Sequence, residues 1–99
     1  MDVHPSLAGQ IRVHPDVVWR DVDGEIVLLN VASGQYFGLD EVGSRVWMLL
    51  QQDGEAGTPI GTLQERVVAE FDVDGPTALA DLTALLQQLQ DQQLVTVGA

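Results

Sequence analysis

The residue types that carry out covalent and metal chemistry are scarce in this sequence. It has no cysteine, so it can form neither a disulfide nor a thiolate metal site. No carboxylate cluster stands at a metal-ligand spacing around its two histidines, His4 and His14, and we interpret both as exposed structural residues. Ser44 follows a glycine but lacks the second glycine of a nucleophile turn. The sequence therefore predicts no enzyme, no metal and no cofactor.

Two partial motifs for phosphate and calcium binding also lack required members. The segment 54–57 has two glycines but neither the lysine nor the hydroxyl residue of a phosphate-binding loop. Asp72 and Asp74 resemble the first ligands of a calcium loop, yet the glycine and glutamate that should follow are missing at the required offsets. We interpret the many carboxylates as solvated surface groups, which leaves binding as the chemistry to consider.

The net charge of the chain indicates which classes of binding partner to expect. The chain has 4 basic residues, none of them lysine, and 15 acidic residues, which gives a formal net charge of −11. A surface for duplex DNA or for an anionic membrane needs several cationic side chains, so the sequence predicts neither partner. A basic peptide or a basic protein face would be attracted. The alternative is that the acidity only keeps the protein in solution.

The N-terminal stretch shows no sign of export or of early regular structure. It lacks a basic start followed by an apolar run, and no apolar segment of the chain approaches the length of a membrane span. We therefore expect a soluble, cytoplasmic protein. Pro5, Gly9 and Pro15 interrupt the first residues, so we predict a loose arm over 1–16, with Gln10–Val13 extended, before a single domain.

Three β-prone runs predict an antiparallel sheet in which each strand pairs with the next. Residues 17–22 and 25–30 flank Asp23-Gly24, a strong signal for a two-residue hairpin turn. The second run is apolar on both predicted faces, which implies cover on both sides or one face left for a partner. After a turn at 32–34 the chain continues into a third strand, Gln35–Leu39.

The third strand is predicted to lie at an edge of the sheet. Phe37 and Leu39 fall on one of its faces and Tyr36 on the other. An edge strand has unpaired backbone groups and can accept a partner strand. Residues around Arg12 or the C-terminal tail could instead cover this edge, and the sequence does not decide between the two arrangements.

Three helices are predicted after the sheet. The first follows Asp40, a good N-cap, and extends to about residue 50. A capping box, T-x-x-E, predicts the start of the second at residue 62, and this helix ends near residue 71. The third covers about 76–92, with Asp74 able to cap it and proline in its first turn. Residues 94–97 form a short closing strand or an extended tail.

The apolar stripe of the third helix is broader than a small core requires. One interpretation is a helix that borders both the core and a groove, and the alternative is a helix that is simply well buried. Asp81 lies on the wider side of this stripe, which makes it the carboxylate best placed near a groove. The stripe consists of Leu79, Leu82, Leu86 and Leu89, widened by Ala78 and Leu85.

Three stretches, taken in order, resemble the PqqD family. The run LDEVGSRVWMLL at 39–50 is similar to the family's L-N-x-T/V-G/A-x-x-I/V-W-x-L-L stretch. Residues 62–74 resemble its second helix and the exit from it. Residues 81–95 resemble its ending, D-V-x-x-F-L-x-x-L followed by G-L-I/V. The resemblance covers about residues 17–97. Gln93 departs from it, because glycine is usual there, and the loop 53–61 is longer than common.

The resemblance implies a fold and a binding mode. The fold is α+β, a winged helix-turn-helix with a three-stranded antiparallel N-terminal sheet followed by three helices. Members are recognition elements for ribosomally made, modified peptides, and they bind the leader of the precursor as an added strand beside the third helix. The peptide-binding residues implied for this chain are Leu28, Gln35, Tyr36, Phe37, Gly38, Leu39, Asp81, Leu82, Leu85 and Gln88. Which face of the third strand carries the side-chain pocket stays open.

The expected function is that of a non-catalytic adaptor. The first strands look more like the stand-alone proteins of lasso-peptide pathways than like the quinone-cofactor protein, so the expected partners are a precursor leader, a leader peptidase and a cyclase. One alternative is a peptide chaperone for a radical SAM enzyme. Another, from a different class, is a winged-helix transcription regulator, which the charge disfavours.

Overall fold

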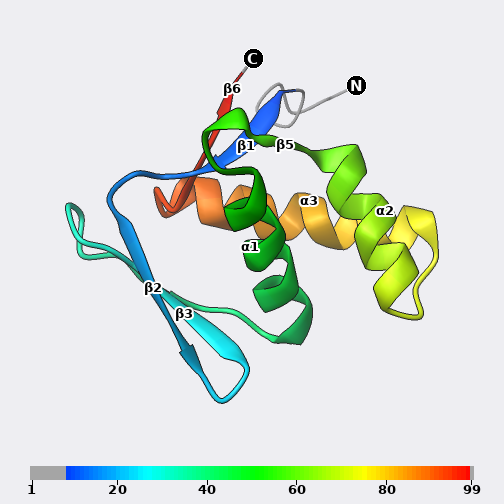
Figure 1. Cartoon of the computed structure of the whole chain (residues 1–99), viewed down its shortest axis with the longest axis horizontal. Coiled ribbons are helices and arrows are strands. Elements are labelled where there is room, and N and C mark those ends of the chain that lie inside the picture. Colours follow the sequence, from blue (N-terminus) through cyan, green and yellow to red (C-terminus); the bar gives the residue numbers. More distant parts are fainter. Residues whose placement is uncertain (1–8, 99) are drawn as a thin grey trace.

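Two small sheets and three helices make up the computed structural model, which describes residues 9–98 (Figure 1). The α+β class and the order predicted from the sequence, a three-stranded antiparallel sheet followed by three helices, are confirmed. The elements in chain order are β1 Gln10–Val13, β2 Val17–Val22, β3 Glu25–Asn30, β4 Tyr36–Gly38, α1 Glu41–Asp53, the 3-10 turn η2 Gly54–Ala56, β5 Thr58–Pro59, α2 Ile60–Glu70, α3 Gly75–Asp91 and β6 Val95–Gly98.

The predicted sheet has the strand order β2-β3-β4, and all its pairs are antiparallel. Its hairpin turns at Asp23 and Gly24, which have positive φ angles of 55° and 91°, as a tight turn between twisted strands requires. β4 is one residue shorter at each end than the predicted strand. It lies at the edge of the sheet, and no strand in the part of the chain that the structure describes covers its outer side.

The two faces of this sheet differ in burial. Trp19, Leu28 and Phe37 face one another across the three strands, and Leu28 is completely buried in the core. The neighbouring row on the opposite face runs from Val18 through β3 to Tyr36, and these two side chains are 52% and 70% exposed. Phe37 and Tyr36 therefore lie on opposite faces, as expected, and Val27 and Leu29 on the outer face of β3 are half-buried.

The second sheet was not predicted. β1 is its central strand, paired antiparallel with β5 on one side and β6 on the other. Gln10–Val13 is extended, as expected, but Ile11 is fully buried, so this part of the predicted arm belongs to the folded core. Residues 1–8 of that arm lie outside the described residues, and the domain boundary at residue 17 stays a prediction.

The second sheet also answers the question of what covers β4. β1 and the C-terminal strand β6 pair with each other along their whole length. Neither one reaches the outer edge of β4. Within residues 9–98, the structure therefore has the arrangement in which no strand covers this edge.

Two of the three helix starts follow the prediction. The side chain of Asp40 accepts from the N–H of Gly43 at 2.8 Å and caps α1, and Asp74 caps α3 in the same way. The capping box predicted for the second helix is wrong. α2 begins at Ile60, because β5 leads directly into it and the extended Pro59 precedes its first turn.

α1 lies between the other elements, and its Trp47 and Val46 are completely buried. α3 buries Leu82, Leu86 and Leu89 in the same core, whereas Leu79 is 39% exposed and does not belong to the buried stripe. The buried face is centred closer to Ala78 than the stripe predicted from the sequence. In the part of the chain described by the structure, no helix is long and apolar enough to cross a membrane.

The end of α3 explains the departure at Gln93. This residue has a φ of 63°, the left-handed conformation that glycine adopts most easily. Its N–H donates to the carbonyl of Gln90 at 3.0 Å, and the N–H of Leu94 donates to that of Leu89 at 2.8 Å. These two bonds form a Schellman motif, so the glycine-type exit is retained without glycine.

Candidate functional site

A cleft of about 360 Å³ lies between the N-terminal end of α1, α2 and α3. All four residues predicted on the third helix, Asp81, Leu82, Leu85 and Gln88, line it. Leu82 is 2% exposed and forms part of the cleft floor, whereas Leu85 is half-buried and Asp81 and Gln88 are exposed at the surface. The remaining lining residues are Asp40, Val42, Gly43, Val67, Val73, Ala78 and Ala84.

The chemistry of the cleft combines apolar walls with an acidic rim. Val67 and Val73 face it from α2 and the following loop, opposite the half-buried Leu85. Asp40 and Asp81 contribute the two carboxylates. Asp40 is committed to capping α1 through its bond to a backbone N–H, whereas Asp81 is exposed on α3. The cleft can therefore take an apolar side chain together with a donor or a cation that faces Asp81.

β4 forms the second part of the candidate site. The carbonyl of Gln35 and the N–H of Leu39 both bond to β3, at 2.9 and 2.8 Å. Because hydrogen bonds alternate in direction along an antiparallel strand, Phe37 also faces β3, and the backbone N–H and C=O groups of Tyr36 and Gly38 face the open edge. These two residues supply the donors and acceptors that an added strand would use.

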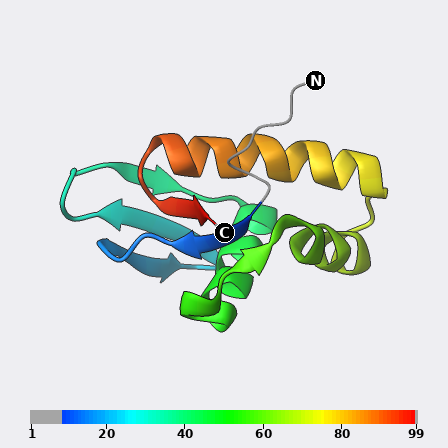
Figure 2. The ribbon, with the colours of Figure 1, turned by 90° about the horizontal axis from the view of Figure 1, so that it is seen from above.

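The strand and the cleft are adjacent in the fold. β4 leads through Leu39 into Asp40, which lines the cleft. Figure 2 shows the strands with β4 drawn next to α3 and β2 farther from that helix. Phe37 is half-buried and packed against the core, whereas Tyr36 points away from it. Side chains of an added strand that share the face of Phe37 are therefore turned toward the helical layer.

The structure separates the ten predicted site residues into accessible and buried ones. Leu28 is completely buried, Leu39 is 4% exposed and Leu82 is 2% exposed, so these three support the site from behind and offer little surface to a ligand. The other seven are exposed or half-buried: Gln35, Tyr36, Phe37, Gly38, Asp81, Leu85 and Gln88. The four residues on α3 share one cleft, and the strand residues form the neighbouring edge.

Sequence reasoning missed the walls that α1 and α2 give to the cleft. Val42 and Val67 each stand at helical spacing with other apolar residues of the sequence, but that spacing indicates only that a helix has a buried side. Val73 lies in a connecting segment, which has no periodic signal. Their common position became visible only when the packing of the three helices was known.

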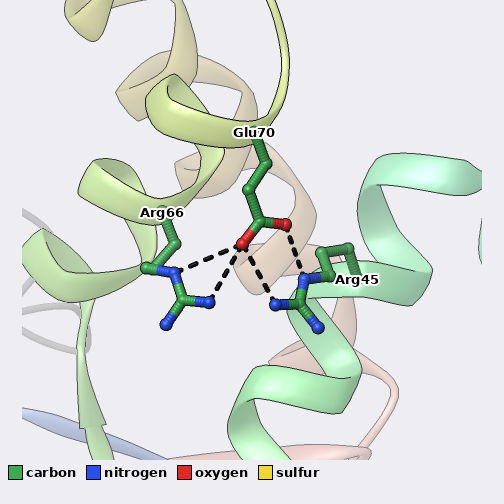
Figure 3. A network of polar contacts seen from close by, with 3 residues as sticks. All are labelled: Arg45, Arg66 and Glu70. Carbon is green, nitrogen blue, oxygen red and sulfur yellow. Dashed lines mark hydrogen bonds and ion pairs between the residues drawn. The ribbon is translucent and has the colours of Figure 1, made fainter.

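A charged cluster joins α1 to α2 on the surface (Figure 3). The guanidinium of Arg45 contacts both carboxylate oxygens of Glu70, at 2.6 and 3.0 Å, and Arg66 contacts the same carboxylate at 3.0 Å. Hydrogen bonding from Arg45, reinforced by Arg66, lowers the pKa of Glu70, and the same bond raises the pKa of Arg45. Two of the four arginines thus pair with this one carboxylate, and the chain as a whole has a formal net charge of −11.

Fold and site together define a small binding domain with an open edge strand beside a helix-lined cleft. Residues 25–95 match the family model described as coenzyme PQQ synthesis protein D (PqqD). This match covers β3, β4, the three helices and the start of β6. The chain belongs to the PqqD family.

Two solved structures are similar to this chain over most of its length. The first is TbiB1 in complex with the TbiA(beta) leader peptide, with 36% sequence identity, a TM-score of 0.77 and coverage of 89% of this chain and 98% of that chain. The second is lasso peptide synthetase B1 complexed with the leader peptide, with 21% identity, a TM-score of 0.72 and coverage of 88% and 98%. The second similarity concerns the fold alone. No curated protein sequence matches this chain.

Proposed function

We propose that this protein binds the leader of a ribosomally made precursor peptide by adding it as a strand to β4. The observation that carries this proposal is the open edge of β4, next to the α3 cleft. Support comes from the 36% identity to TbiB1, a protein whose structure contains a bound leader peptide. Backbone pairing would supply affinity, and pockets for alternate side chains would supply specificity.

In this proposal some residues bind the leader through backbone groups and others through side chains. Tyr36 and Gly38 offer their outward backbone groups to the added strand. Leader side chains on the face shared with Phe37 reach toward the cleft, where Leu85 contacts an apolar anchor and Asp81 accepts from polar or basic groups. The net charge of −11 favours a leader with basic residues.

In this proposal the protein is a non-catalytic adaptor of a lasso-peptide pathway. It holds the leader in the cytoplasm, where precursors are synthesised, and presents the precursor to a leader peptidase and a cyclase. The family description supports a second candidate, a PqqD-type chaperone that delivers a peptide to a radical SAM enzyme. The resemblance of the first strands to the stand-alone proteins of lasso-peptide pathways favours the lasso pathway, and the 36% identity to TbiB1 supports leader binding.

Titration of labelled ligands tests the proposed function. The ligands are a fluorescent lasso-precursor leader, a fluorescent quinone-precursor peptide and a fluorescent DNA duplex, each followed by polarisation in moderate salt. We expect saturable binding of the lasso leader and weaker or no binding of the other two. Saturable binding of the quinone-precursor peptide alone would favour the chaperone. Binding of the duplex without binding of either peptide would refute the proposal in favour of a transcription regulator.

A further inference from the structure

Asn30 is a buried polar residue at the end of β3. It is 1% exposed, and the amide of its side chain makes three hydrogen bonds in two directions. The oxygen Oδ1 accepts from the backbone N–H groups of Ala32 and Ser33, at 2.9 and 3.1 Å. The nitrogen Nδ2 donates to the backbone carbonyl of Gln93 at 2.6 Å. Both ends of this amide are therefore satisfied inside the protein.

The oxygen side of Asn30 shapes the turn that leads into β4. Its two acceptor bonds hold residues 32 and 33 close to the end of β3. The backbone of Asn30 adds two more bonds, one to the carbonyl of Gln35 and one from the N–H of Gly34. These contacts determine where β4 begins and how it lies against β3.

The nitrogen side of Asn30 reaches the other wall of the site. Gln93, in the left-handed conformation, belongs to the exit from α3 and lies five residues after Gln88 of the cleft. Within residues 9–98, this contact is the hydrogen bond that joins the β2-β3-β4 sheet to α3 or to its exit. A buried amide in such a place costs free energy unless it is paired, so the bond favours one separation of strand and helix.

We infer that Asn30 is a positioning residue for leader binding. Its side chain sets the separation between the β4 edge and α3. This inference rests on the proposed function, because it assumes that the leader contacts both walls. Asn30 itself is buried beneath the surface, so it acts on the leader through β4 and α3. If the β4 edge and α3 already have the separation that the peptide requires, they need not rearrange when it binds. Preorganisation of this kind increases affinity.

Asn30→Asp separates the two roles of the side chain. A carboxylate keeps acceptors for the turn N–H groups, but at about pH 8 it has no proton to donate to the carbonyl of Gln93. We expect leader affinity to fall about three- to tenfold, the effect of one lost hydrogen bond, while the circular dichroism spectrum remains that of the wild type. Asn30→Ser, whose hydroxyl is too short to span both contacts, is the second variant and should lose affinity as well.

Two comparisons distinguish positioning from a general loss of stability. At about pH 5.5 the buried carboxyl of Asn30→Asp becomes protonated and regains an O–H donor, so its affinity relative to the wild type at the same pH should recover. Ile11→Val, a core change in the other sheet, serves as the destabilised control and should bind the leader like the wild type.

The outcomes separate this inference from the proposed function. Wild-type affinity in both folded Asn30 variants would refute the positioning role and leave leader binding intact. An equal loss of affinity in Ile11→Val would also refute it, because general destabilisation would then explain the result. If the wild type itself bound no leader, the proposed function would fail, and the inference with it.

Discussion

Asp81 is the α3 residue whose side chain would contact a peptide in the cleft. It is exposed on α3 at the rim of the cleft, one turn before the half-buried Leu85. The sequence predicted this position from the width of the apolar stripe, and the structure places Asp81 on the cleft with no partner side chain in the part of the chain that it describes. Its carboxylate is therefore available to a ligand.

Asp81→Ala is expected to weaken leader binding about tenfold, because a hydrogen bond to a charged group contributes about 1.5–3 kcal/mol and an exposed rim position gives the lower end. Polarisation titration at low salt measures this change. The matched control is Asp91→Ala at the end of the same helix, outside the cleft lining, where we expect little effect. Equal affinities of Asp81→Ala and the wild type would remove Asp81 from the site.

At the scale of elements, the sequence predicted what depends on local signals. The Asp23-Gly24 turn and the caps at Asp40 and Asp74 are short-range features, and the structure has all three. The second sheet could not be predicted in this way. β1 and β6 pair Ile11 with Val97, at opposite ends of the chain, and strands of four residues show too little alternation to reveal a partner.

The same limit explains the wrong start of the second helix and the part of the site that was missed. Thr62 and Glu65 have the spacing of a capping box, but β5 pairs with β1 and leads the chain into α2 two residues earlier. The α3 side of the cleft was implied by the family resemblance, which names four residues of this helix, and the width of the apolar stripe also indicated Asp81. The opposite wall, with Val67 and Val73, comes from other elements, and its position depends on how the helices pack.

Tyr36→Pro tests the strand that was predicted to accept the leader. Proline removes the backbone N–H that faces the open edge and spares the bonds between β4 and β3. We expect leader binding to be lost or strongly reduced in a protein whose thermal unfolding remains cooperative. Tyr36→Ala, which keeps the N–H, is the control and should bind more tightly than the proline variant. Unchanged affinity of Tyr36→Pro would exclude strand addition at β4.

The ion pair between α1 and α2 gives the protein a pH-dependent contribution to stability. Because the pKa of Glu70 is lowered from its ordinary value of 4.5, its carboxylate stabilises the folded state above that value. The contribution is lost as the pH falls through the lowered pKa. The difference in unfolding free energy between wild type and Glu70→Gln should therefore be constant near neutral pH and shrink below about pH 4.5, as urea denaturation can measure.

Arg45→Gln tests the cause of that contribution, because hydrogen bonding from Arg45 is the largest cause of the lowered pKa. The double variant Arg45→Gln/Glu70→Gln should lose less stability than the sum of the two single variants. Two results would contradict the assignment of this stabilisation to the ion pair. One is that the losses of stability in the two single variants add up to the loss in the double variant. The other is that the difference in unfolding free energy between wild type and Glu70→Gln grows as the pH falls.

In the whole molecule, one core joins the open edge of β4 and the α3 cleft. α1 contributes the buried Trp47 to the centre of this core, β3 packs on it through Leu28, and α3 packs on it through Leu86. The strand edge and the helix are thus parts of one folded unit. In the proposed function, a leader completes this unit as a further strand on β4.

Amide hydrogen exchange with and without a saturating lasso-precursor leader tests this claim most directly. The N–H groups of Tyr36 and Gly38 face the open edge, so they should exchange quickly in the free protein and become protected when the leader binds. The N–H of Leu39, already bonded to β3, should change much less. Unchanged exchange at Tyr36 and Gly38 in a protein saturated with leader would contradict the account, because the leader would then bind elsewhere.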